Sequence, residues 1–86
     1  MVEVFDKKPR EMILELFDKK KSYLSKLALK TGTTFSYSVR ILQGLEDLGL
    51  IKRTKKGRIN ILQLTSKGVR IAIRLKEVNE IMEDGN

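Results

Sequence analysis

The sequence predicts a small α+β domain, mainly α-helical, in which three helices are followed by a β-hairpin and a last helix. Apolar residues recur with helical spacing up to Leu48 and again after Ser66. The segment between them has the branched residues and turn signal typical of two strands. The 86 residues, 41% of them hydrophobic, contain no internal repeat and no linker rich in proline or serine. Residues 1–86 are therefore expected to form a single domain.

The first helix is expected to start near Pro9, because the first position of a helix does not need the N–H group that proline lacks. Ile13, Leu16 and Phe17 form its apolar stripe. The helix is expected to end in the lysine cluster 19–21, since positive side chains are favourable at the negative end of the helix dipole.

A short second helix is expected to follow this cluster. Ser22 is its predicted N-cap, and Gly32 supplies the left-handed conformation that ends many helices. Between these two residues, the positions that recur at helical spacing are Leu24, Leu27, Ala28 and Thr31.

The third helix is expected to run from its N-cap Thr34 to about Leu48, with Gly49 as its stop. Because only Thr33 separates Gly32 from this N-cap, residues 22–48 are expected to form a helix-turn-helix. A helical wheel predicts that one face is turned to the core: Thr34, Ser38, Ile41, Leu42, Leu45 and Leu48. It predicts that five other side chains point away from this face: Ser36, Tyr37, Arg40, Gln43 and Asp47.

Residues 50–64 are expected to form a β-hairpin. The ranges 50–54 and 58–64 are rich in branched residues, and they flank Gly57, which can adopt the positive φ of a hairpin turn. This segment also holds most of the net charge of +7, because residues 50–68 contain six Lys or Arg and no acid. A basic hairpin by itself is most often a solvated loop, so its meaning depends on its neighbours.

The last helix is expected over residues 66–82, with one side turned to the core through Ile71, Leu75, Val78 and Met82. It has a second set of apolar residues, for which we expect a role in a twofold homodimer: Val69, Ile73 and Ile81. Val2, Val4 and Phe5 in the N-terminal arm are expected to help form this dimer. The alternative is that the N-terminal arm of the same subunit covers this second face.

The composition excludes several classes of function. The chain has no cysteine and no histidine, so disulfides, thiolate metal sites and the commonest general base are absent. No nucleophile–base pair can be assembled, and we expect neither enzymatic activity nor a metal or other cofactor. The N-terminus has no signal-peptide pattern and no apolar run approaches the roughly 18 residues of a membrane span, so we expect a cytoplasmic protein. Its richness in Lys and Glu is compatible with a thermophilic source.

Three stretches of the sequence resemble the winged-helix family. The stretch "SYLSKLALKTGTTFSYSVRIL" (22–42) fits its helix-turn-helix, and "LEDLGLIKR" (45–53) looks like the junction between recognition helix and wing. The stretch "LTSKGVRIAIRL" (64–75) looks like the junction between the wing and the final helix. The similarity covers roughly residues 9–76 and points to small MarR-like and ArsR-like transcriptional regulators of prokaryotes. It implies a winged helix-turn-helix with a three-helix core, a hairpin wing and a C-terminal helix.

This chain also departs from those families. Metal sensors of the ArsR type use Cys and His ligands, which are missing here. MarR-like regulators are usually longer, with further helices that build the dimer and an effector pocket. We therefore expect neither metal sensing nor a small-molecule effector.

The resemblance implies a sequence-specific regulator that binds an inverted repeat in double-stranded DNA as a homodimer. The third helix would enter the major groove, where its contacts with bases or phosphates are expected from Ser36, Tyr37, Arg40 and Gln43. The wing would neutralise phosphates through Lys52, Arg53, Lys55, Lys56 and Arg58. Weaker backbone contacts are expected from the second helix through Ser22, Lys26 and Lys30.

Other interpretations remain open from the sequence alone. Arg40 could instead form a surface ion pair with Asp47, and Tyr37 could be a packing residue. The same basic wing would suit an architectural, nucleoid-associated protein that reads DNA shape without base contacts. Winged helices also serve as protein–protein modules, although the polar third helix and the basic wing favour DNA.

Overall fold

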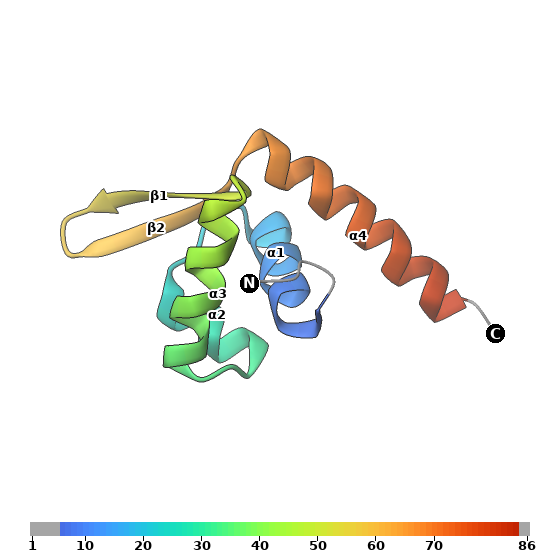
Figure 1. The fold of residues 1–86 in the computed structure, drawn as a ribbon, viewed down its shortest axis with the longest axis horizontal. Coiled ribbons are helices and arrows are strands. Elements are labelled where there is room, and N and C mark those ends of the chain that lie inside the picture. The colour runs from blue at the N-terminus through green and yellow to red at the C-terminus, as the bar shows by residue number, and fades with distance from the viewer. Residues whose placement is uncertain (1–5, 85–86) are drawn as a thin grey trace.

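The computed structural model describes residues 6–84, so the predicted role of Val2, Val4 and Phe5 falls outside the described range. The elements follow the order α1 (Lys7–Lys19), α2 (Leu24–Thr31), α3 (Phe35–Asp47), β1 (Ile51–Lys56), β2 (Ile59–Leu64) and α4 (Ser66–Asp84). This order confirms the predicted fold class. The hairpin of β1 and β2 projects from one side of the α1–α3 body, and the C-terminal part of α4 projects from the other (Figure 1).

Helix α1 begins two residues earlier than the sequence predicted. Asp6 is its N-cap, which places Pro9 at the third helical position instead of the first. Proline is tolerated there because the first N–H group bonded within the helix is that of Arg10, which donates to the carbonyl of Asp6. The predicted residues Ile13 and Leu16 are fully buried.

The prediction that Ser22 caps α2 is wrong. The N-cap is Tyr23, and it makes no side-chain capping hydrogen bond. Ser22 instead pairs with β2, exchanging two backbone hydrogen bonds with Leu62 at 3.1 and 2.7 Å. The extended backbone that this pairing requires keeps Ser22 out of the helix and places its side chain in the interior. At the other end of α2, Gly32 adopts the predicted left-handed conformation with φ of 62°.

Helix α3 has the predicted N-cap, since the Thr34 hydroxyl accepts a hydrogen bond of 3.2 Å from the backbone N–H of Tyr37. Its predicted core side is mostly correct, with the buried residues being Ser38, Ile41, Leu42 and Leu45. Thr34 and Leu48 are exposed, contrary to prediction. Both are capping residues outside the regular helix, so the helical wheel does not give their direction.

Strands β1 and β2 form a two-stranded antiparallel sheet with Ile51 opposite Leu64 and Lys56 opposite Ile59. This register leaves a two-residue turn in which Gly57, with φ of 63°, occupies the first position, as glycine does in one of the favoured hairpin turns. The strands are buried only at their base, and the tip is exposed.

The core lies where all these elements meet. Helices α1, α2, α3 and α4 and the base of the hairpin each contribute to one cluster: Met12, Ile13, Leu16, Leu27, Ile41, Leu42, Leu45, Leu50, Ile51, Leu62, Ala72 and Leu75. Because the hairpin base and α3 share this core, the wing has a fixed position relative to the third helix.

The start of α4 is joined tightly to the end of α3. A Cβ atom at Gly68 would lie 2.1 Å from the carbonyl oxygen of Leu50, so only glycine fits there. The Thr65 hydroxyl donates to the carbonyl of Gly49 at 2.6 Å and accepts from the N–H of Gly68 at 3.0 Å. These contacts give a physical reason for the threonine and glycine of the sequence "LTSKG".

The far end of α4 differs from the prediction. Leu75 is buried as expected, but Val78 and Met82, predicted to face the core, are 44% and 74% exposed. The helix continues to Asp84, past the α1–α3 body (Figure 1), and the side chains of residues 80–83 are all exposed.

Candidate nucleic-acid interface

The outward face of α3 presents hydrogen-bonding side chains. Ser36, Arg40 and Gln43 are all exposed, and their helical spacing places them on neighbouring turns of one stripe. Tyr37 is exposed at the edge of this stripe that lies away from the hairpin. Within residues 6–84, Arg40 forms no ion pair with Asp47, so its guanidinium is available to a partner.

The hairpin presents its cations on both faces and at its tip. Side chains alternate along a strand, so Lys52 and Lys56 lie on one face of β1 while Arg53 and Lys55 lie on the other. Arg58 lies in the turn. All five are exposed, and the hairpin contains no acid to neutralise them.

Arg53 is bound to α3. Its Nε and Nη2 donate to the two carboxylate oxygens of Glu46 at 2.8 and 2.5 Å, a two-pronged ion pair between the wing and the third helix. The hydrogen bond with Glu46 raises the pKa of Arg53 above its ordinary value. Arg53 is therefore engaged within the protein and does not have the free position that the sequence suggested. The other four cations of the hairpin have no ion-pair partner within residues 6–84.

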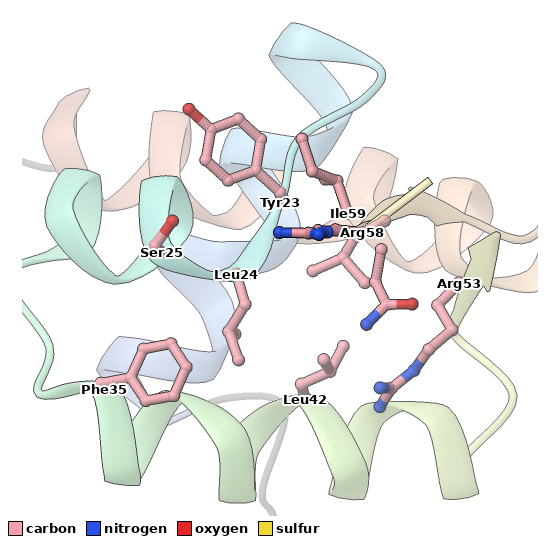
Figure 2. Close-up of a pocket in the computed structure, with 10 residues that line it drawn as sticks. Tyr23, Leu24, Ser25, Phe35, Leu42, Arg53, Arg58 and Ile59 are labelled. Carbon is pink, nitrogen blue, oxygen red and sulfur yellow. The ribbon is translucent and has the colours of Figure 1, made fainter. Parts of the chain in front are cut away.

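A groove of about 390 Å³ separates α3 from the hairpin. Figure 2 shows Phe35 and Leu42 on its α3 side, Leu24 at the start of α2, and Arg53 and Arg58 from the hairpin. The third helix and the basic wing thus border the same hollow and lie on the same side of the molecule.

The three residues predicted to contact the DNA backbone from the second helix lie in different surroundings. The Ser22 hydroxyl is buried and has no hydrogen-bond partner among the described residues, so it is not placed to meet a phosphate. Lys30 lines a different hollow, beside Glu11 and Glu15 of α1. Lys26 is exposed.

Three residues of this surface were not predicted from the sequence: Glu46, Phe35 and Ser25. Ser25, in the first turn of α2, lines the groove together with Phe35, and Glu46 holds Arg53. Glu46 could have been found from the sequence, because helical spacing places it on the same side of α3 as Leu42, which faces the hairpin.

The described residues contain no cluster of three or more acidic residues that could hold a metal ion. None of the helices between residues 6 and 84 is long and apolar enough to cross a membrane.

The chain matches no protein-family model. It is 32% identical over 62 residues to an uncharacterised protein of Archaeoglobus fulgidus, a match that covers 72% of this chain and 65% of that protein. The chain thus spans slightly less than two thirds of that relative's length.

Solved structures resemble most of the chain. A crystal structure from Archaeoglobus fulgidus has a TM-score of 0.86 at 27% identity, covering 93% of this chain and 92% of that one. A MarR family transcriptional regulator from Silicibacter pomeroyi has a TM-score of 0.83 at 22% identity, covering 92% of this chain and 57% of that one. FabT of Streptococcus pneumoniae, solved in complex with DNA, has a TM-score of 0.77 at 25% identity, covering 88% and 57%.

The fold and the placement of the basic hairpin define the class of this protein as a winged helix-turn-helix. Within that class its fold is similar to that of the MarR family transcriptional regulator from Silicibacter pomeroyi, in agreement with the resemblance seen in the sequence.

Proposed function

We propose that this protein is a transcriptional regulator that binds specific sequences in double-stranded DNA. Helix α3 enters the major groove and the β1–β2 wing lies on the phosphate backbone. The protein acts in the cytoplasm, on the nucleoid, by occupying a promoter. This chain shares its fold with FabT, and the structure of FabT in complex with DNA supports DNA as the partner.

The observation that carries the proposal is the groove shared by α3 and the wing. A reading helix and a phosphate-binding hairpin can engage one duplex only if both face the same side, and here Phe35 of α3 and Arg58 of the wing line the same hollow. The sugar–phosphate backbone of one DNA strand would lie in this protein groove. Helix α3 would then occupy the DNA major groove on one side of that backbone, and the wing would lie on its other side.

The outward stripe of α3 supplies the chemistry of base recognition. Arg40 can donate two hydrogen bonds to O6 and N7 of guanine, and Gln43 can pair with N6 and N7 of adenine. Ser36 and Tyr37, near the N-terminus of α3, can bind a phosphate or a base edge. The availability of Arg40, which has no acidic partner among the described residues, favours this role.

The wing supplies the phosphate contacts. Lys52, Lys55, Lys56 and Arg58 are exposed and have no ion-pair partner among the described residues, so each can neutralise a phosphate and release counterions. Arg53 has a different role, because its pair with Glu46 holds the wing against α3.

The protein acts as a twofold homodimer through α4, and the dimer binds an inverted repeat with half-sites about one helical turn apart. Val78, Ile81 and Met82 project beyond the body on the last turns of α4 and are exposed. Their side chains are 44%, 68% and 74% exposed, compared with 37% and 41% for Val69 and Ile73. Val78 and Met82 lie on roughly the opposite side of the helix from those two residues.

Selection of binding sites from random duplexes tests the proposed function. We expect a palindromic site to be enriched. Arg40→Ala should then relax the preference at one base pair, while Lys55→Ala should weaken binding to all sequences alike.

The main alternative is an architectural DNA-binding protein, which the basic wing also favours. Random DNA that competes as well as any selected site would establish the architectural function instead. Absence of any salt-dependent binding to duplex DNA would exclude both and favour a protein–protein module.

A further inference from the structure

Two exposed apolar side chains interrupt the polar surface of α3. Val39 and Phe35 are 39% and 60% exposed, although α3 has a separate, well-buried core side. They lie one helical turn apart, and Gln43 follows Val39 by one further turn, so the three form a row beside the Ser36–Arg40 stripe. The row lies on the side of α3 nearer the hairpin, since Phe35 borders the groove (Figure 2).

No element among the described residues covers Val39 to the extent that the core covers Ile41. Burial in the folded chain therefore does not account for an apolar residue here. Its surroundings are cationic and hydrogen-bonding, with Arg40 next to it in sequence and the basic wing across the groove. A partner that matches the cationic surroundings must be polyanionic. A partner that matches the exposed Val39 side chain must also present an apolar group where the outward face of α3 contacts it.

The major groove of DNA has one such group, the 5-methyl of thymine. The geometry agrees with contact there, because four residues of α-helix rise about 6 Å, compared with about 3.4 Å per base-pair step. Val39 and Gln43 would therefore reach base pairs one or two steps apart.

We propose that Val39, with Phe35 beside it, packs against the 5-methyl group of a thymine, one or two base pairs from the adenine bound by Gln43. The inference rests on the proposed function and adds a specificity that hydrogen bonds alone would not give. In each half-site, the base pairs contacted by the row Phe35–Val39–Gln43 are therefore expected to be A·T pairs.

The test replaces thymine by deoxyuridine, one position at a time, in a duplex obtained by selection. This change removes the methyl group and leaves the hydrogen-bonding groups of the base pair intact. At the position under Val39, deoxyuridine should weaken binding about fourfold, the factor for loss of one buried methyl group. Deoxyuridine at thymines outside the half-sites should leave the affinity unchanged.

The variant Val39→Ala should bind the thymine and deoxyuridine duplexes equally at that position, because the contact is already lost. Leu29→Ala is the control, because it shortens an exposed apolar side chain of α2 that lies outside the proposed DNA and dimer surfaces. It should retain the fourfold ratio between the two duplexes.

Equal binding of wild-type protein to every deoxyuridine duplex would overturn the inference, and so would a full fourfold ratio in Val39→Ala. In both cases the selected site would still be bound, so the proposed function would stand. A protein that binds no duplex DNA at all would overturn the proposed function and this inference together.

Discussion

The ion pair between Glu46 and Arg53 leads to a prediction that separates two roles for the wing cations. Both side chains are partly exposed, 24% for Glu46 and 43% for Arg53, so water screens the pair. We expect Glu46→Gln to lower the free energy of unfolding by only about 0.2–1 kcal/mol, the range of exposed pairs. Chemical denaturation at low and high salt measures this cost, which should shrink as salt rises.

The larger effect should appear in DNA binding. Glu46→Gln removes one negative charge beside α3 and releases the Arg53 guanidinium for a phosphate. Each added phosphate contact steepens the slope of log K against log salt by about 0.9. Arg53→Gln should leave the wild-type slope nearly unchanged, because Arg53 is already engaged by the carboxylate.

Lys55→Gln is the matched comparison, since Lys55 lies on the same face of β1 as Arg53 and has no acidic partner among the described residues. It should make the slope shallower by about 0.9 for each bound subunit, or about 1.8 for the dimer. Fluorescence anisotropy with a labelled duplex over a range of salt concentrations gives all four slopes. If Arg53→Gln flattens the slope as much as Lys55→Gln, then Arg53 contacts phosphate in the complex and the reasoning from the ion pair is refuted.

Three further predictions concern specificity, the fold and assembly. Arg40→Ala should cost about 1–3 kcal/mol of discrimination at one base pair, measured by competition between single-base variants of the selected site, and uniform weakening at every position would contradict base reading. Gly68→Ala should lower the melting temperature, with a loss of about 1–3 kcal/mol, because its Cβ would meet the carbonyl oxygen of Leu50; unchanged stability would show that the junction adjusts freely. The double change Val78→Glu/Met82→Glu should halve the mass measured by sedimentation equilibrium, and a mass equal to that of the wild type would exclude this end of α4 from a dimer interface.

Much of the fold was predictable because local signals and global packing agree. Gly32 and Gly57 both take the positive φ that their positions in the sequence predicted, and Thr34 caps α3 as expected. The errors occur where tertiary contacts override a local signal. Ser22 is a good capping residue by type, but its backbone pairs with Leu62, forty residues later in the chain, and no local pattern contains that information.

The end of α4 shows a second limit of the sequence. Val78 and Met82 continue the helical spacing of Ile71 and Leu75, so the pattern correctly places them on one side of the helix. Periodicity does not state how far the neighbouring element extends, and the α1–α3 body ends before these turns. The same signal therefore describes core residues in one half of α4 and exposed residues in the other.

For the candidate interface, the sequence showed which residue types are present, and the structure showed which of their side chains are exposed and unpaired among the described residues. The exposure of Arg40 and Gln43 followed from the helical wheel. That Arg53 is engaged, and that Lys30 lies beside the acids of α1, depends on which elements are neighbours in space. A count of basic residues along the chain cannot separate free cations from paired ones.

NMR titration of the labelled protein with a selected duplex shows whether α3 and the wing bind one duplex together. We expect the largest changes in backbone amide shifts on residues 35–47 and 51–60, with the exposed face of α1 unaffected. Changes confined to the wing, or centred on α1 and α4 with none on α3, would show that the two elements do not share a duplex.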